Sequence, residues 1–312
     1  MLTQAGKVKK RISGMIKVLL IILVILVVLF CVFAFLIPDI IMSGKRHTFD
    51  ESRAWQNAHY DTSFYDKLKK TNYVVKGFEN YELHVQLLEN PEQSTKYMIL
   101  SHGYTDNRIG DLKYAKMYID FGFNCIIYDL RGHGENLKTI TTYGIREGKD
   151  LKCIIDDTRK RYKDVSFLGL HGESLGAATT ITSLKYKPEV DFVVADCGFS
   201  DIENVLLNLY KNHHIPIGLY SLADKMCKLR YHVSLSAARP IDSLDENTVP
   251  ILFMHGADDT FIPPKNTEDM AARTKGYREL HMVPKAEHAL SIITDPKQYR
   301  AYVKEFLNKI CN

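Results

Sequence analysis

The sequence lacks the short motifs that proteins use to bind metals, nucleotides or redox partners. Its six cysteines include no C-x-x-C pair, which argues against a zinc ribbon and a thioredoxin-type site. No H-E-x-x-H pair is present, and residues 144–150 do not have the spacing of a phosphate-binding loop. The adjacent pair His213 and His214 has no further ligand nearby, so we expect it at the surface. We therefore expect no metal and no cofactor.

The sequence also has little excess charge. A net charge of +4 is too small to indicate a nucleic-acid partner, and several basic residues are concentrated near the N-terminus. No stripe of basic residues is interleaved with aromatic ones. A hydrophobic share of 46% and a charged share of 25% are those of an ordinary globular protein. A chain of 312 residues can form one large α/β domain or two small ones.

One long apolar run stands near the N-terminus, over residues 18–37. These twenty residues carry no charge, and as a helix rising 1.5 Å per residue they span a hydrocarbon core of about 30 Å. A cleaved signal peptide has a shorter apolar core, about 7–15 residues, and a small-residue cleavage site, which residues 37–41 do not provide. A buried core helix has a polar face, and this segment has none. We predict one uncleaved transmembrane helix.

The charges that flank this helix predict its orientation. Five basic residues precede it, whereas three follow soon after it: Lys45, Arg46 and Arg53. The positive-inside rule then predicts a single-pass protein of the cell membrane, with a cytoplasmic tail (residues 1–17) and the remainder extracytoplasmic. That remainder divides into a connector (residues 38–70) and a folded domain (residues 71–312). The outer part carries five cysteines, an odd number, and Cys125 and Cys153 lie in apolar runs typical of packed free thiols.

Short apolar runs alternate with helical segments through the folded domain. Strands are expected at residues 81–87, 97–101, 123–129, 192–196, 250–255 and 277–283 and from Val165, with helices at 111–121, 148–162 and 297–310. This alternation predicts a mostly parallel sheet with helices on both faces, whose sites lie at the carboxyl ends of the strands. The alternation stops over residues 198–249. We expect this insertion to form a helical cap with an apolar side, or to complete the core.

The strand that begins at Val165 leads into the G-E-S-L-G motif at residues 172–176, and small residues able to begin a helix follow. At such a strand-to-helix turn, flanking glycines permit a bend that exposes the serine hydroxyl over the sheet edge. The N-terminus of the following helix offers free N–H groups to an oxyanion. A bare G-x-S-x-G occurs by chance in roughly one chain of this length in ten. Its setting between a strand and a helix is what indicates Ser174 as a nucleophile.

Taken together, these motifs resemble the α/β-hydrolase fold, and more narrowly the membrane-anchored or secreted bacterial α/β-hydrolases. They are H-G at residues 102–103, D-L-R-G-H-G at 129–134, G-E-S-L-G at 172–176 and H-G-A-D-D-T-F-I-P at 255–263. The resemblance covers essentially everything from residue 71 to the C-terminus. It implies a mostly parallel twisted sheet with a helical cap insertion. The chain departs from the pattern at Asn136, where the family often has Ser.

A serine hydroxyl needs a base to take its proton and a carboxylate to orient that base. The chain order of this fold, Ser then acid then His, implies His288 as the base for Ser174. Two adjacent acids, Asp258 and Asp259, follow the same strand, and spacing alone does not separate them. The family pattern falls on Asp259. Asp196, at the end of the preceding strand, is a further candidate, with a helix cap as its alternative role.

The resemblance also implies an oxyanion hole made of two backbone N–H groups, those of Leu175 and Tyr104. The histidines that precede glycines at strand ends are interpreted as structural: His102, His133 and His171. A substrate pocket is expected from residues around the nucleophile and in the insertion: Tyr104, Glu173, Tyr210, Ile215 and Tyr220.

These features predict a membrane-anchored serine hydrolase that acts on small-molecule acyl esters, as a carboxylesterase, lipase or thioesterase, through an acyl-enzyme. Esters and thioesters are favoured over peptides because no second domain that would gate a peptide is visible in the sequence. A serine peptidase of the same fold is one alternative. A non-catalytic binding module at the cell surface is another, although such proteins usually lose a member of the triad. Nothing in the sequence indicates an oligomeric state.

Overall fold

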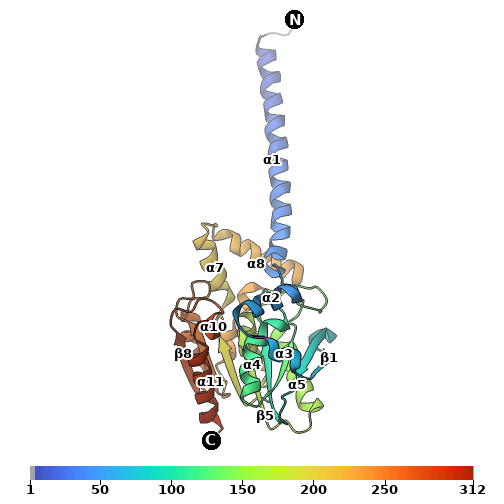
Figure 1. Ribbon diagram of the computed structural model, residues 1–312. Coiled ribbons are helices and arrows are strands. Elements are labelled where there is room, and N and C mark those ends of the chain that lie inside the picture. Colours follow the sequence, from blue (N-terminus) through green and yellow to red (C-terminus); the bar gives the residue numbers. More distant parts are fainter. Residues whose placement is uncertain (1–3, 312) are drawn as a thin grey trace.

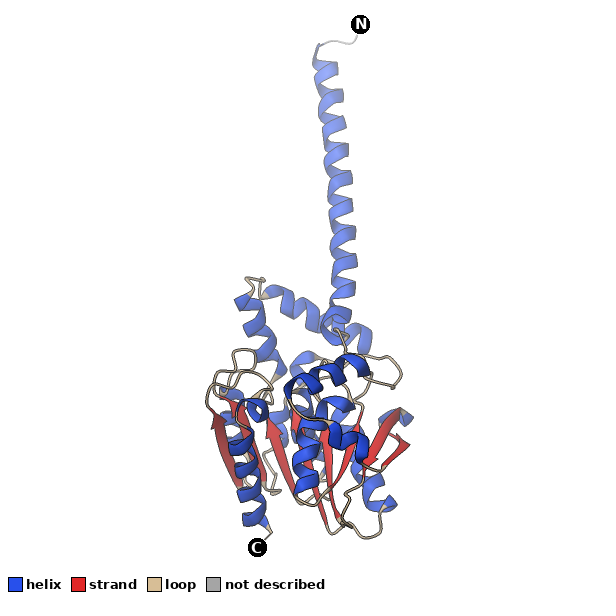
Figure 2. Ribbon diagram, in the orientation of Figure 1, coloured by secondary structure: helices blue, strands red, loops and turns tan. Residues whose placement is uncertain are grey.

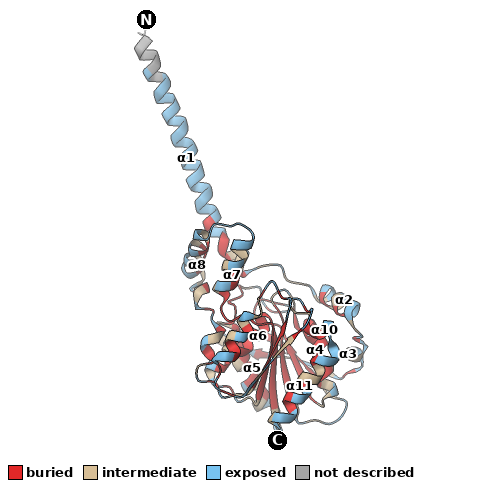
Figure 3. Cartoon of the chain, turned by 90° about the vertical axis from the view of Figure 1, so that its left-hand side faces the viewer, coloured by how far each residue is buried: buried red, intermediate tan, exposed pale blue. Residues whose placement is uncertain are grey.

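The computed structural model describes residues 4–311 and consists of one long helix that projects from an α/β domain (Figure 1). Helix α1 (Gln4–Met42) contains a segment, Arg11–Met42, that is long and apolar enough to cross a membrane. Most of its apolar side chains are exposed along its length (Figure 3). Only at its end do side chains become buried against the domain, among them Ala34, Ile37 and Met42. By length and composition, this segment fits a membrane anchor or a signal sequence.

Hydrogen bonds and an ion pair fix the end of α1 to the domain. The Asp39 carboxylate forms an ion pair with Arg230 at 2.7 Å. The backbone carbonyl oxygen of Ile41 accepts hydrogen bonds from the hydroxyls of Tyr104 and Tyr143. These contacts join residues far apart in the sequence, and they hold the start of the domain at a fixed position relative to α1.

Two short helices, α2 (Phe49–His59) and α3 (Ser63–Lys67), follow within the predicted connector. A capping box begins α2: the Thr48 hydroxyl accepts from the backbone N–H of Glu51, whose carboxylate accepts from that of Thr48. The next element, β1 (Lys70–Lys76), is a strand that the sequence analysis did not predict. Only Val75 in it is buried, so this edge strand shows no clear alternation of apolar and polar residues.

One eight-stranded sheet crosses the domain in the order β1-β2-β4-β3-β5-β6-β7-β8 (Figure 2). After β1, the strands are β2 (Glu82–Leu88), β3 (Lys96–Ser101), β4 (Asn124–Tyr128), β5 (Phe167–Glu173), β6 (Phe192–Asp196), β7 (Ile251–Gly256) and β8 (Arg278–Val283). The strand β2 pairs antiparallel with β1 and β4, and all pairings from β4 to β8 are parallel. The predicted, mostly parallel sheet is therefore confirmed.

Helices pack on both faces of this sheet, as Figure 3 shows with the sheet seen edge-on. Helices α5 (Glu147–Arg161), α6 (Leu175–Ser183) and α9 (Lys265–Arg273) contribute buried side chains to one core layer. Helices α4 (Leu112–Asp120), α10 (Ser291–Thr294) and α11 (Pro296–Ile310) contribute to the other. Alternate residues of β4 enter opposite layers, Ile126 the first and Ile127 the second.

The insertion over residues 198–249 contains α7 (Ile202–Asn212) and α8 (Gly218–Tyr231), which lie at the same end of the domain as the base of α1 (Figure 1). Their inward side chains, Val205, Leu206, Tyr220 and Cys227, join the core layer that contains α6. The insertion therefore forms helices that complete the core, and a cap over the nucleophile stays a prediction.

All six cysteines are free thiols in the structure. Cys125, Cys197 and Cys227 are buried, and Cys153 is half-buried. The odd number of cysteines after α1 therefore requires no disulfide partner, and these thiols pack as small apolar side chains.

Candidate active site

The turn between β5 and α6 holds Ser174 in an unusual backbone conformation, with φ 54° and ψ −112°. Glycines make this turn possible. A Cβ atom on Gly176 would lie 1.8 Å from the carbonyl oxygen of Ser101, and one on Gly172 would lie 2.2 Å from that of Gly176. The Ser174 N–H donates to the carbonyl oxygen of Asp196 at 2.9 Å, which ties the turn to β6. The sequence thus folds here into the sharp turn that its glycines predict.

Three loops at the carboxyl ends of β5, β7 and β8 bring Ser174, Asp259 and His288 together. The Oγ atom of Ser174 lies 2.9 Å from Nε2 of His288, and Nδ1 of His288 lies 2.7 Å from Oδ2 of Asp259. Because the carboxylate only accepts, Nδ1 is the donor in the second bond. The neutral imidazole then has a lone pair on Nε2, directed at the serine hydroxyl. This arrangement can move a proton from the hydroxyl to the ring.

The structure distinguishes between the two adjacent acids. Asp258 is exposed, whereas Asp259 is buried and also accepts hydrogen bonds from the backbone N–H groups of Phe261 and Ile262. Burial by itself favours the neutral acid. Hydrogen bonds from His255 and His288 outweigh it and lower the pKa of Asp259 to about 2. The carboxylate that meets the imidazole is therefore ionised at neutral pH.

Asp196, the further candidate for the acid, is directed elsewhere. Its carboxylate accepts a hydrogen bond from the Ser291 hydroxyl at 3.3 Å, and its Oδ2 atom lies 3.1 Å from the Tyr114 hydroxyl oxygen. Its backbone carbonyl supports Ser174, as described above. Asp196 therefore stabilises the structure around the site: its backbone binds the Ser174 turn, and its side chain binds Ser291.

The loop after β3 lies against the nucleophile. A Cβ atom on Gly103 would be 3.9 Å from the Ser174 Cβ, so the start of this loop is close to the serine. The N–H of Leu175 begins α6 on the other side. The Tyr104 ring is turned toward the end of α1: it stacks on Tyr143 at 5.7 Å, and its hydroxyl bonds the backbone of residues 41 and 44.

The histidines interpreted as structural are buried beneath this loop and the sheet. Nε2 of His102 accepts from the N–H of Leu130 at 3.0 Å, while its Nδ1 lies 2.7 Å from the Gly103 carbonyl oxygen. Burial lowers the pKa of His102 to about 4 and those of His133 and His171 to about 3. Neutral His102 and His133 therefore connect the loops that follow β3 and β4, and neutral His171 contacts Tyr118 of α4.

The residues expected to line a substrate pocket differ in burial and do not all face one cavity. Tyr210 and Tyr220 meet edge to face on α7 and α8, 6.3 Å apart, and Tyr220 is buried. Ile215 lies exposed in the turn between these helices. Glu173 is buried, and its carboxylate is directed into the core and not into an open pocket. A role of these residues in substrate binding stays a prediction.

A buried ion pair that the sequence analysis missed connects the two halves of the site. The Lys113 ammonium pairs with Glu173, the residue before the nucleophile, and donates to the carbonyl oxygen of Ala289, the residue after His288. The Tyr114 hydroxyl donates to the same Glu173 carboxylate at 2.6 Å. Burial alone would lower the pKa of Lys113, but Glu173 more than offsets it and raises that pKa, so the ammonium stays charged. The only feature of the sequence that pointed to this ion pair was the acidic residue Glu173 in a turn expected to be buried.

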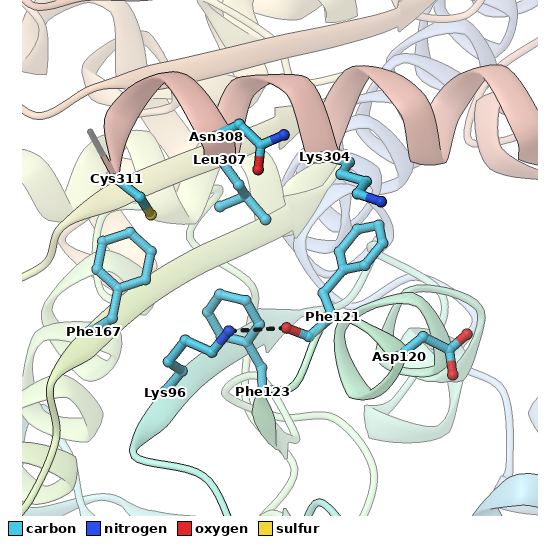
Figure 4. Close-up of a pocket in the computed structure, with 9 residues that line it drawn as sticks. All are labelled: Lys96, Asp120, Phe121, Phe123, Phe167, Lys304, Leu307, Asn308 and Cys311. Atoms are coloured by element: carbon cyan, nitrogen blue, oxygen red, sulfur yellow. Dashed lines mark hydrogen bonds between the residues drawn. The ribbon is translucent and has the colours of Figure 1, made fainter.

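A cavity of about 280 Å³, drawn in Figure 4, lies at the opposite end of the sheet. It is lined by the first residues of β3 and β5, Lys96 and Phe167, and by side chains of α11. Because the triad is at the carboxyl ends of the strands, this cavity is not part of the site. Over the described residues 4–311, no group of three or more His, Cys, Asp or Glu side chains is placed to hold a metal ion.

Comparison with known proteins agrees with this architecture. Residues 111–312 match the prolyl oligopeptidase family. The chain is 30% identical over 265 residues to the uncharacterized protein YqkD of Bacillus subtilis, an alignment that covers 83% of this chain and 86% of YqkD.

Two solved structures show the same fold. The esterase Pf2001 of Pyrococcus furiosus superposes with a TM-score of 0.66 at 22% identity, covering 80% of this chain and 94% of the esterase. The α/β-hydrolase GrgF of a Penicillium species superposes with a TM-score of 0.60 at 16% identity, covering 78% and 99%. These likenesses confirm the predicted α/β-hydrolase fold.

The ion pair between Lys113 and Glu173 predicts a large effect on stability. Replacing Lys113→Met leaves the Glu173 carboxylate buried without its cation, and we expect the free energy of unfolding to fall by about 3–5 kcal/mol. Adding Glu173→Gln removes the unpaired charge and should restore part of that loss. Guanidinium-induced unfolding of the full chain in detergent measures both effects.

Lys116→Met is the matched control, because Lys116 lies on the same helix and forms a more exposed ion pair with Asp120. We expect it to change the free energy of unfolding by less than about 1 kcal/mol. Equal destabilisation by the Lys113 and Lys116 substitutions would refute the structural role of the buried pair.

Proposed function

The chain belongs to the prolyl oligopeptidase family and is an α/β-hydrolase, and we propose that it cleaves small acyl esters with Ser174 as nucleophile, His288 as base and Asp259 as orienting acid. The observation that carries this proposal is the continuous line of hydrogen bonds from the Ser174 hydroxyl through His288 to the Asp259 carboxylate. Nucleophile, base and acid follow one another in the chain order of this fold.

The proposed reaction has two halves. Ser174 Oγ attacks the acyl carbon while its proton moves to Nε2 of His288, and the ionised Asp259 stabilises the imidazolium. The imidazolium then gives this proton to the leaving alcohol, and the acyl group stays on Ser174. Water attacks the acyl-enzyme with His288 again as the base, which releases the acid and restores the serine hydroxyl.

Negative charge that develops on the acyl oxygen needs hydrogen-bond donors. The N–H of Leu175, at the start of α6, is one proposed donor, and the N–H of Tyr104 in the loop beside Ser174 is the other. The position of the Tyr104 loop is fixed by its hydroxyl, which bonds the Ile41 carbonyl, and by His133, whose Nε2 lies 2.7 Å from the Tyr104 carbonyl oxygen. A rigid donor loop needs no reorganisation during the reaction.

The substrate class rests on the likeness to the Pyrococcus furiosus protein, which is an esterase. The family match to prolyl oligopeptidases keeps a serine peptidase as a second candidate. Both candidates use the same triad, so only the choice of leaving group separates them.

We expect the full chain in detergent to hydrolyse short p-nitrophenyl esters faster than aminoacyl p-nitroanilides. Ser174→Ala should lower kcat for the esters by about 10³-fold or more, because the nucleophile is lost. Ser221→Ala, at an exposed serine of α8, is the control and should keep full activity.

The absorbance of released p-nitrophenol and p-nitroaniline measures both reactions. Faster turnover of the anilides would favour the peptidase. Ester turnover that survives Ser174→Ala would rule out the proposed mechanism.

We also propose that α1 anchors the protein in the cell membrane by a single pass, with the hydrolase domain outside the cytoplasm. The support is the exposed apolar segment Arg11–Met42 and the larger number of basic residues before residue 18 than soon after residue 37. The contacts between Asp39 and Arg230 then place α8 close to the membrane surface.

This topology predicts that protease added to intact bacterial cells or spheroplasts digests the domain, while an epitope tag placed before residue 1 stays protected. The full-length chain should remain in the membrane fraction after an alkaline wash. Immunoblots against the tag and the domain measure this. A shortened, soluble chain would indicate a cleaved signal sequence, and a protected domain would indicate the opposite orientation.

A further inference from the structure

A groove of about 760 Å³ opens beside the end of α1, apart from the triad residues. Its walls are the segment that follows α1 (residues 43–48), the loop after β4 (residues 132–146) and Tyr231 of α8. The loop lies directly against the end of α1, because the N–H of Thr141 donates to the carbonyl oxygen of Met42 at 2.7 Å. Figure 1 shows the base of α1 and helix α8 at this same end of the domain.

The lining of this groove is positively charged. Arg46, Lys138 and Arg146 line it together with His47 and hydroxyl-bearing residues, and no Asp or Glu does. Across residues 4–311, no carboxylate forms an ion pair with any of these three cations. By contrast, the buried arginines Arg108 and Arg131 each pair with an aspartate. A groove with three unpaired cations and no acid attracts an anion.

Arg46 is the most constrained of the three cations. One of its terminal nitrogens donates to the Gly132 carbonyl oxygen, and the other donates to the Thr141 hydroxyl at 2.9 Å. Its Nε is buried and has no hydrogen-bond partner. Burial lowers the pKa of Arg46, while nearby groups that include the Glu147 carboxylate act to raise it; Glu147 itself does not line the groove. The guanidinium is therefore fixed in place by uncharged partners and forms no ion pair among the described residues.

We propose that this groove binds the phosphate group of a ligand. Guanidinium and ammonium groups donate charge-assisted hydrogen bonds to phosphate oxygens, and the hydroxyls of Ser43, Thr48 and Thr139 line the same walls. A phosphate has enough oxygens, and at neutral pH enough charge, to engage several of these donors at once. The volume of the groove also accommodates more than the phosphate itself.

The groove borders the loops that support the proposed oxyanion donor. The N–H of Gly44 donates to the Tyr104 hydroxyl at 3.0 Å, and His133 follows Gly132 and contacts the Tyr104 carbonyl oxygen. Two sources of phosphate fit this position. One is the headgroup of a membrane lipid, which would lie at the membrane surface where α1 ends, and the other is a soluble phosphate ester. The lipid source rests on the proposed membrane anchor, whereas the phosphate chemistry does not.

The test measures binding by the full chain in detergent with Ser174→Ala as the background, so that no hydrolysis is needed. One arm titrates inorganic phosphate and glycerol 3-phosphate, and the other titrates phosphatidate in mixed micelles against diacylglycerol, which lacks the phosphate. Isothermal titration calorimetry gives the dissociation constants. We expect Lys138→Gln/Arg146→Gln to weaken binding by at least about tenfold, because two charged donors are lost.

The pair Lys160→Gln/Lys163→Gln makes the same change of net charge at the end of α5 and should leave binding unchanged. Lys138→Gln alone, at an exposed side chain, should weaken binding measurably without affecting the fold. Loss confined to phosphatidate identifies a lipid headgroup, and loss in the soluble arm identifies a soluble ester. Binding that is absent in both arms, or equally affected by the groove and control pairs, would overturn the proposal. Because all binding is measured with Ser174→Ala, none of these outcomes depends on esterase activity.

Discussion

The backbone of Ser174 is the constraint on which the rest of the site depends. A non-glycine residue with positive φ is unfavourable by about 1–3 kcal/mol unless its surroundings hold it. Here Gly172 and Gly176 permit chain segments to approach more closely than any side chain would allow, and the hydrogen bond from the Ser174 N–H to Asp196 fixes the turn. The serine hydroxyl is thereby presented to His288 at the edge of the sheet.

Contacts between distant segments keep that geometry. Lys113 on α4 holds the turn before Ser174 through Glu173 and the loop after His288 through Ala289. On the other side, Tyr104 connects the loop beside the serine to the end of α1. The proposed membrane anchor, the donor loop and the basic groove are thus parts of one connected structure, so the domain cannot be considered separately from the segment that precedes it.

Much of this could be predicted from the sequence, because strands and glycine-bounded turns have local signals. The parallel strands and the turn at Ser174 follow from apolar runs and from the spacing of the glycines. The choice between Asp258 and Asp259 did not follow from spacing, since only the folded loop decides which carboxylate is buried against His288. The role of Lys113 had no local signal either. A lysine on an amphipathic helix is usually exposed, and its partners lie 60 and 176 residues away.

The most direct test of the account is reaction of the folded, full-length protein with a fluorophosphonate probe, which labels only an activated serine. The account predicts stoichiometric labelling at Ser174, identified by peptide mass analysis, with no labelling of Ser174→Ala and much slower labelling of His288→Ala. Labelling of another serine, or a folded wild-type protein that does not react at all, would contradict the claim that this turn activates its serine.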